Sequence, residues 1–183
     1  IFEGLNSFSD LEERISSIDN NKLKGDVFEV FVEGFLHTQP AYCVESVWPW
    51  LNVPEEVKSS LELSIKDDYG IDGVFRTRTG QIATYQAKFK SDKRRLSWGG
   101  DKLGNFFGLT KKDDFKYIIT NSYRLPDNVL KDRKDVCTIT AEQFKGMCRT
   151  DFDLINDWLK GAKIVRSFKA PLSHQKDAVE AIA

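Results

Sequence analysis

The stretch Lys66–Arg95, KDDYGIDGVFRTRTGQIATYQAKFKSDKRR, decides how the rest of the chain is interpreted. It contains two β-prone runs separated by a glycine-containing pair, which is a strong local signal for a β-hairpin. We predict that Asp72–Arg78 forms one strand, that Thr79-Gly80 makes the turn, and that Gln81–Lys90 forms the return strand. The remaining elements are placed relative to this hairpin.

The return strand has one apolar and one polar face, because successive side chains of a strand point to opposite sides. The apolar side chains, which we expect to meet the core, are Tyr85, Ala87 and Phe89. The polar side chains, which we expect to meet solvent or a ligand, are Thr84, Gln86, Lys88 and Lys90.

One end of the hairpin brings together a carboxylate, an amide oxygen and an ammonium. Gln86 and Lys88 point the same way from the return strand, and the facing strand begins at Asp72. Oxygen ligands suit Mg²⁺, which polarises a phosphoryl group and generates hydroxide. An ammonium stabilises the negative charge that develops during the reaction. The arrangement therefore indicates metal-assisted cleavage of a phosphodiester.

Asp72-Gly73 followed by Gln86-Ala87-Lys88 resembles the signature of PD-(D/E)xK nucleases, in the Mrr-like variant in which glutamine replaces the second acid. The resemblance implies an α/β fold with a restriction-endonuclease-like mixed central sheet, flanked by helices and carrying a catalytic β-hairpin. It also implies a DNA endonuclease that depends on Mg²⁺, or alternatively on Mn²⁺. Asp72, Gln86 and Lys88 would be catalytic, and the first two would bind the metal.

Glu29 joins this set through the same resemblance. It ends the segment KGDVFE at Lys24–Glu29, and Mrr-like nucleases often carry a G-x-x-F-E pattern on the helix before the catalytic hairpin. There the glutamate approaches the metal, so the resemblance implies a catalytic and metal-binding role for Glu29. A solvated helix carboxylate is the alternative, because exposed glutamates are common on helices.

The run Lys88–Arg95 holds five basic residues and one acid, and it begins at the lysine of the signature. Phosphate backbones attract such clusters. We therefore expect DNA contacts from Lys90, Lys93, Arg94 and Arg95. A solvated charged face is the alternative. Upstream, Asp67 and Asp68 are either turn residues or additional carboxylates near the metal.

Helical and strand patterns predict the other elements. The expected helices are Phe8–Ile18, Lys22–Thr38, Asp101–Leu109, Leu125–Asp132 and Asp151–Lys160. In the first helix, Ser9 is the expected N-cap, with Glu12 completing a capping box. The expected strands are Cys43–Trp50, Phe115–Thr120 and Asp135–Thr140. The segment Leu51–Ser64 stays undecided, and Trp48 and Trp50 are interpreted as packing residues in preference to base-stacking platforms.

Composition predicts a soluble globular protein. The 183 residues are 40% hydrophobic and 30% charged, and the formal net charge of −1 means that any nucleic-acid surface must come from local clustering. No apolar run approaches the roughly 18 residues of a membrane span, and the first residues lack a signal-peptide pattern. The three cysteines are widely spaced, which favours a reducing, cytoplasmic location without a membrane partner.

The tail Lys169–Ala183 resembles the R-x-H-Q-x-x-A entry to the motor of superfamily 2 helicases, in which the glutamine recognises adenine. The resemblance implies nucleotide binding by Gln175, and a need for ATP only in a motor beyond this chain. A terminal amphipathic helix is the alternative. We expect an N-terminal helical extension (1–21), a nuclease domain (22–165), and a linker with the start of a truncated motor (166–183), as in single-polypeptide Type I restriction enzymes.

The expected partners are double-stranded DNA and downstream helicase or translocase domains of the same polypeptide. A catalytically silent DNA-binding or docking domain is the alternative function, because folds outlive activities. An accessory domain of an RNA-processing helicase is a third. Gln86 offers a neutral oxygen where most of the superfamily has a carboxylate, so we expect the isolated fragment to cleave DNA poorly and without sequence preference.

Overall fold

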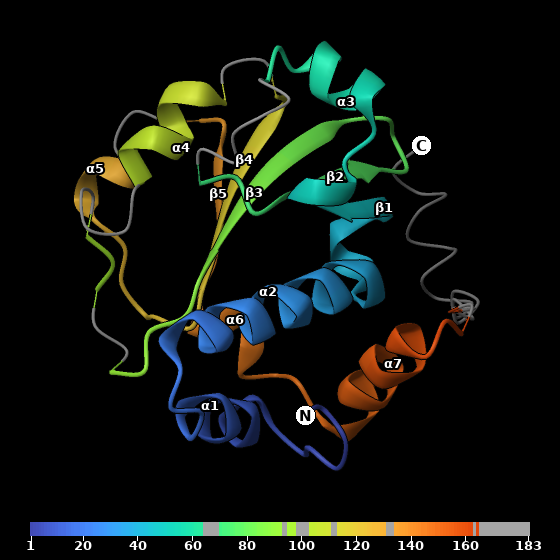
Figure 1. Ribbon diagram of the computed structural model, residues 1–183, viewed down its shortest axis with the longest axis vertical. Coiled ribbons are helices and arrows are strands. Elements are labelled where there is room, and N and C mark those ends of the chain that lie inside the picture. The colour runs from blue at the N-terminus through green and yellow to red at the C-terminus, as the bar shows by residue number, and fades with distance from the viewer. Residues whose placement is uncertain are drawn as a thin grey trace, which may run out of the picture.

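The computed structural model describes residues 1–63, 70–92, 95–97, 103–110, 113–130, 134–162 and 164. In this part of the chain, five strands form one sheet in the order β1-β2-β3-β4-β5, with helices on both faces (Figure 1). The strands are β1 (Val44–Pro49), β2 (Gly73–Thr77), β3 (Ile82–Lys88), β4 (Phe115–Thr120) and β5 (Val136–Ile139). β1, β2 and β3 pair antiparallel, and β3, β4 and β5 pair parallel. The predicted mixed α/β sheet is confirmed.

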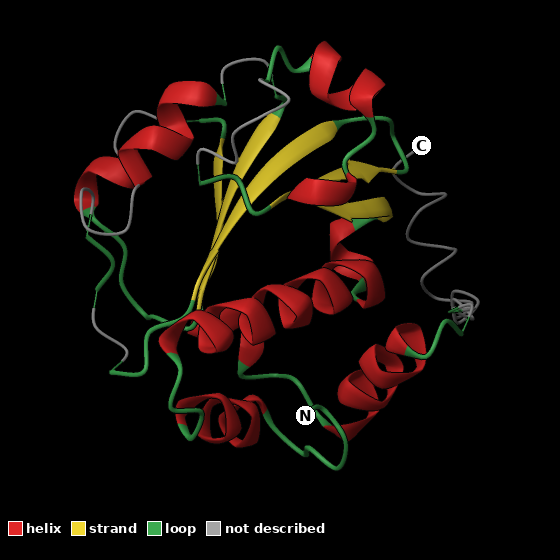
Figure 2. Cartoon of the chain, in the orientation of Figure 1, coloured by secondary structure: helices red, strands yellow, loops and turns green. Residues whose placement is uncertain are grey.

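The helices form two layers, one on each face of the sheet (Figure 2). On one face lie α1 (Phe8–Ser16), α2 (Asn21–Thr38), α6 (Ala141–Phe144) and α7 (Arg149–Leu159). On the other face lie α3 (Glu55–Ser60), α4 (Leu103–Leu109) and α5 (Asp127–Leu130). Two short 3₁₀ turns, η1 (Pro40–Tyr42) and η2 (Trp50–Asn52), flank β1. The segment that the sequence left undecided therefore contains η2 and α3.

Each helical layer covers its own hydrophobic core. The core under α2 is rich in aromatic residues, including Phe28, Phe31, Phe75, Tyr85 and Phe152. The core on the α3 and α4 side includes Val57, Ile71, Val74, Phe106 and Ile118. β2 and β3 are thus buried on both faces, as strands near the middle of a two-layered α/β sheet are.

α1 is part of the main core. Its buried side chains, Phe8, Leu11 and Ile15, pack in the same cluster as α2 and the sheet. Its N-cap is Ser7, whose hydroxyl accepts a hydrogen bond from the backbone N–H of Asp10, and Asp10 completes the capping box. The expected cap at Ser9 with Glu12 is wrong. Glu12 is buried instead.

The hairpin of β2 and β3 forms where expected, but both strands are shorter than predicted, and the loop contains Arg78 as well as the expected Thr79 and Gly80. Thr77 donates its backbone N–H to the Gln81 carbonyl at 2.9 Å, and Gly80 takes a φ of 85° at the tip. Gly73 has a different reason to be glycine. A Cβ there would lie 2.3 Å from the Tyr85 hydroxyl and 2.5 Å from the Trp48 carbonyl oxygen, because the Tyr85 side chain crosses directly over Gly73.

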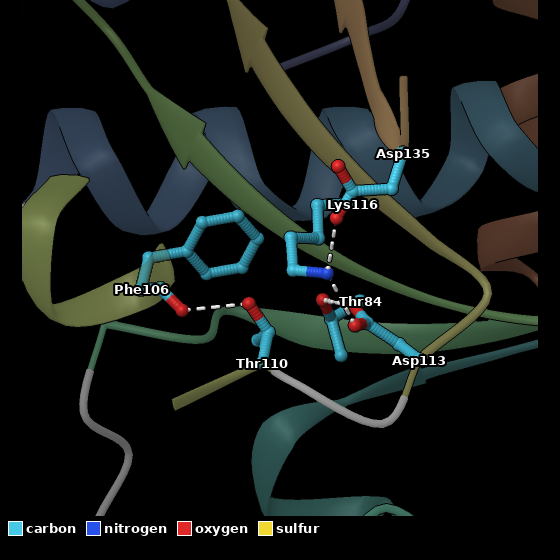
Figure 3. Close-up of polar contacts among 6 residues, drawn as sticks. All are labelled: Thr84, Phe106, Thr110, Asp113, Lys116 and Asp135. Carbon is cyan, nitrogen blue, oxygen red and sulfur yellow. Dashed lines mark hydrogen bonds and ion pairs between the residues drawn. The ribbon is translucent and has the colours of Figure 1, made fainter. Parts of the chain in front are cut away.

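Two of the four side chains on the polar face of this hairpin strand do not meet solvent, which corrects our expectation, whereas Lys88 and Lys90 stay partly exposed. Thr84 and Gln86 are fully buried, because the layer of α3, α4 and α5 covers this face. Thr84 finds partners there: its hydroxyl donates to Asp113, whose carboxylate lies 2.9 Å from the Lys116 ammonium (Figure 3). Lys116 also contacts Asp135 at 2.7 Å. Satisfied polar groups can be buried in this way at little cost.

Candidate active site

Asp72 and Lys88 meet where β2 begins and β3 ends. The Lys88 ammonium lies 3.4 Å from Asp72 Oδ2, and the backbone N–H of Ala87 donates to the same oxygen at 2.7 Å. The exposed fractions of the two side chains are 26% for Lys88 and 15% for Asp72. The pair is therefore largely desolvated and still reachable from outside.

The backbone of Asp72 is held from both sides. Its N–H donates to the Tyr85 carbonyl of β3 at 3.0 Å, and its own carbonyl accepts the N–H of Trp50 in η2, also at 3.0 Å. These bonds extend the hydrogen-bond ladders of β1, β2 and β3 to the residue before the first residue of β2. The carboxylate thus extends from a fixed backbone instead of from a free loop.

Glu29 lies close enough to this pair to interact electrostatically with it. Its side chain is half-buried on α2. Burial, and then the negative charge of Asp72, raise the pKa of Glu29 to about 7, while the positive charge of Lys88 acts in the opposite direction. Residues from α2, from the start of β2 and from the end of β3 are thus brought together.

Gln86 lies beside the pair in the sequence but differs from it in environment. Its backbone stands opposite Ile118 of β4, and its side chain is fully buried. Within the described residues, neither Oε1 nor Nε2 of Gln86 has a hydrogen-bond partner. A buried amide without partners is uncommon and calls for an explanation, such as an ion or a water.

Glu33 and Tyr85 are near the site but were not among the candidates. Burial raises the pKa of Glu33 to about 7. Burial also raises the pKa of the Tyr85 hydroxyl, followed by the charges of Glu33, Asp72 and Glu29. Glu33 follows Glu29 by one helical turn, and this spacing could have identified it. Tyr85 gave no signal beyond an apolar position.

The residues present fit a divalent metal ion. The negative charge of Asp72 contributes to the raised pKa of Glu29, and a cation between the two carboxylates would relieve their repulsion. The unpartnered Gln86 Oε1 is an additional hard oxygen. In the described part of the chain, no three His, Cys, Asp or Glu side chains gather closely enough to hold an ion. In this part of the chain, the oxygen donors considered for an ion are thus two carboxylates and one amide, and not a cluster of three acidic side chains.

The basic residues behave differently from one another. Arg95 is exposed, but its guanidinium pairs with Asp127 at 2.9 Å and donates to the Leu125 carbonyl. Lys90 is half-buried, and its backbone is held by the side chain of Asn121. Other expected site residues lie outside the described residues: Asp67, Asp68, Lys93, Arg94 and Gln175.

Within the described residues, no helix has the length and apolar character needed to cross a bilayer.

Comparison with known proteins identifies the fold and the family. Over 96% of its length the chain resembles the ATP-dependent Type ISP restriction-modification enzyme LlaBIII bound to DNA, with a TM-score of 0.59 and 20% identity. Over 84% it resembles the DNA modification-dependent restriction endonuclease AspBHI, with a TM-score of 0.53 and 19% identity. The chain spans 11% of the first of these chains and 38% of the second. No curated protein matches the sequence significantly.

The sequence itself matches a family model. Residues 37–155, well over half of the chain, match the Mrr-type model described as restriction endonuclease. This range contains Asp72, Gln86 and Lys88 but does not include Glu29 on α2. The two structural likenesses agree with this match at the level of the fold. The chain therefore belongs to the restriction endonuclease family, as an Mrr-like domain.

Proposed function

We propose that this domain hydrolyses phosphodiester bonds of double-stranded DNA, with Mg²⁺ as cofactor, as the nuclease module of an ATP-driven restriction-type translocase. The observation that carries the proposal is the pair formed by Asp72 and Lys88, with an ammonium 3.4 Å from a carboxylate that also accepts a backbone N–H. Membership of the restriction endonuclease family supports the reaction class. Because LlaBIII was determined bound to DNA, its likeness favours DNA as the partner.

The chain's own side chains take distinct roles in this proposal. Lys88 orients the attacking water and stabilises the negative charge on the scissile phosphate. Asp72, held by the Ala87 N–H, keeps the ammonium of Lys88 in place until substrate arrives. Glu29 adds a second carboxylate to the site from α2, close enough to Asp72 and Lys88 to interact with both charges.

Asp72, Glu29 and the amide oxygen of Gln86 would hold the Mg²⁺ ion. When bound, the ion supplies Lewis-acid activation of the phosphate and of the attacking water. Because Gln86 contributes a neutral oxygen, affinity for the ion depends more heavily on the two carboxylates and on the DNA itself. Mn²⁺, which binds the same ligand types more tightly, is the natural alternative in an assay.

The wider assembly is also part of the proposal. The likeness to LlaBIII covers a small share of that enzyme, and the tail Lys169–Ala183 has the pattern of a helicase entry, with Gln175 as the adenine-recognising residue. Further helicase or translocase domains of the same polypeptide would consume ATP and move DNA past the nuclease.

Substitution of the central pair tests the reaction. In the complete polypeptide with ATP and Mg²⁺, we expect Asp72→Asn and Lys88→Ala each to reduce cleavage of duplex DNA by at least about a hundredfold. Asp153→Asn and Lys145→Ala, which remove the same charges from exposed ion pairs on other helices, should cleave normally.

Two results would change the proposal. Wild-type cleavage by both site variants would remove the nuclease assignment. If no variant cleaves, wild type included, while DNA binding persists, the domain is a catalytically silent DNA-binding module, the alternative that follows because folds outlive activities. Competition between duplex DNA and duplex RNA decides the polymer.

A further inference from the structure

A buried polar contact holds the chain just beyond Lys88. The side-chain amide of Asn121, at the end of β4, accepts the backbone N–H of Lys90 at 2.7 Å and donates to the Lys90 carbonyl at 2.9 Å. β3 ends at Lys88, so this one side chain holds the backbone of the chain two residues beyond the end of the strand. Asn121 has an exposed fraction of 1%.

The same amide reaches a third element. Asn121 Nδ2 also donates to Glu12 Oε1 at 3.1 Å, and Glu12 is 7% exposed on α1. The N-terminal helix is therefore linked through one side chain to the end of the strand that carries Lys88. No feature of the sequence pointed to Asn121 and Glu12 as a pair, because they are 109 residues apart.

α2 contacts the same segment. The ring of Phe28 lies 5.6 Å from the ring of Phe89, and the Lys24 ammonium donates to Ser91 Oγ at 3.4 Å. Phe28 directly precedes Glu29, and Phe89 directly follows Lys88. Whatever fixes residues 89–91 thus also fixes the relative position of the carboxylate from α2 and the ammonium from β3.

Burying these polar groups has an energetic cost that an apolar contact would avoid. An amide and a carboxylate removed from water need full hydrogen bonding merely to recover their lost solvation. What these groups provide is directionality. The two hydrogen bonds to Lys90 keep good geometry only when its backbone is in one position. The arrangement suits a device that sets position.

We propose that Asn121 is a positioning residue, which with Glu12 holds the end of β3 so that Lys88 meets Asp72 and Glu29 in a reactive geometry. The inference rests on the proposed nuclease function. It also makes α1 part of the catalytic unit, since Glu12 supplies the outer end of the contact. Asn121 touches neither substrate nor metal in this role and acts through the backbone of Lys90.

The test compares Asn121→Ala with a variant of similar stability altered far from the site, such as Ile155→Val in the α2–α7 core. Single-turnover cleavage is measured at saturating DNA in the complete polypeptide, beside the Kd for DNA and the hydrogen-exchange rate of the Lys90 amide. We expect Asn121→Ala to slow cleavage about tenfold to a hundredfold, with Kd changed less than about twofold. The Lys90 amide should exchange at least about tenfold faster.

Further variants separate position from folding. Glu12→Gln keeps an acceptor for Asn121 and should cleave near the wild-type rate, whereas Glu12→Ala should resemble Asn121→Ala.

Equal cleavage rates for Asn121→Ala and the Ile155→Val control would overturn the inference, as would unchanged exchange at Lys90. If wild type itself does not cleave, the proposed function fails, and the exchange rate then decides the positional contact alone.

Discussion

Gly73 illustrates how a single absent side chain shapes the hairpin that carries the candidate site. Its backbone φ is not in the left-handed region, so the sequence-level reason for glycine at a turn does not apply. The reason is close approach: Tyr85 crosses over it and the Trp48 carbonyl lies beside it. Glycine therefore follows Asp72 because Tyr85 and the Trp48 carbonyl leave no room for a Cβ at this position.

We expect Gly73→Ala to destabilise the protein by about 1–3 kcal/mol, because the added methyl overpacks a site closed by backbone as well as by a ring. Urea denaturation measures the change. Gly25→Ala is the matched control. Nothing lies within 4 Å of a Cβ at Gly25, so this change in the interior of α2 should stabilise by about 0.5–1 kcal/mol. Equal effects at both positions would contradict the steric explanation.

Glu33 gives a pH prediction. Its pKa is raised by burial from 4.5 to about 7 in the folded protein, so the fold binds the proton more tightly than the unfolded chain does. Stability from this group is therefore greatest below the unfolded pKa and is lost as pH rises through the interval from 4.5 to about 7. Thermal unfolding of Glu33→Gln in metal-free buffer should show a smaller decrease of Tm across that interval. An unchanged pH profile would show that Glu33 has its ordinary pKa.

For individual residues, the sequence predicted the contact between Asp72 and Lys88 but not the burial of Gln86 beside them. Spacing alone placed Asp72 and Lys88 together, because alternation along a strand and the hairpin register are local rules. Alternation also placed Gln86 on the face of β3 opposite the apolar one. It could not indicate that a second helical layer covers that face. That burial depends on α3 and α4, which lie elsewhere in the chain.

Among the elements, β4 carries a charge network that contacts β3, in which Lys116 and Asp113 are buried and Asp135 is partly exposed. Lys116 bridges Asp113 and Asp135, and Thr84 of β3 donates to Asp113 (Figure 3). Burial alone would lower the pKa of Lys116, but its hydrogen bonds to the two aspartates outweigh this and raise it. The network joins the starts of β4 and β5 to the middle of β3.

Removing the ammonium should therefore be costly. We expect Lys116→Met to destabilise the protein by about 3–5 kcal/mol, because it leaves the carboxylate of Asp113 buried and without its counter-charge. Lys145→Met, which breaks a solvent-exposed pair with Glu142, should change stability far less. Chemical denaturation compares the two. If the double variant Lys116→Met with Asp113→Leu is as unstable as the single one, the loss comes from packing and not from charge.

Elements with strong patterns were predicted well, and their ends less well. α2 and β4 agree with the expected Lys22–Thr38 and Phe115–Thr120 within one residue, because long periodic or strongly β-branched runs leave little choice. The cap of α1 is Ser7 and not Ser9, because Asp10 completes a capping box with Ser7, a pairing that the Ser-x-x-Glu pattern used for the prediction does not include.

At the scale of the whole molecule, DNA binding should be electrostatic and local, since the net charge is −1. We expect the affinity for duplex DNA to fall with salt, and Lys90→Ala to reduce the slope of log K against log salt by about 0.9 for each phosphate that is no longer neutralised. Arg95→Ala should change the slope by less than about 0.9, because Asp127 and the Leu125 carbonyl already engage its guanidinium. A full change of about 0.9 at Arg95 would show that DNA displaces Asp127.

The overall architecture could be predicted from sequence, whereas the joining of distant segments could not. A hairpin followed by strands that alternate with helices implies a mixed sheet. The contact between Glu12 and Asn121, and the shared core of α1 and α2, depend on packing that no local pattern encodes. The proposed boundary between residues 21 and 22 stays a prediction, although α1 packs in the same core as α2.

The two kinds of pairing made by β3 also have a consequence for the order of folding. Its antiparallel partner β2 is joined to it by a tight turn, so Asp72 and Lys88, 16 residues apart, can meet as soon as the hairpin closes. Its parallel partner β4 must first loop back across the sheet, and the link from Glu12 to Asn121 spans 109 residues of the chain. Contacts of such long sequence separation form slowly. We therefore expect the contact between Asp72 and Lys88 to form early in folding. The final position of the C-terminal end of β3 should be reached among the last folding steps.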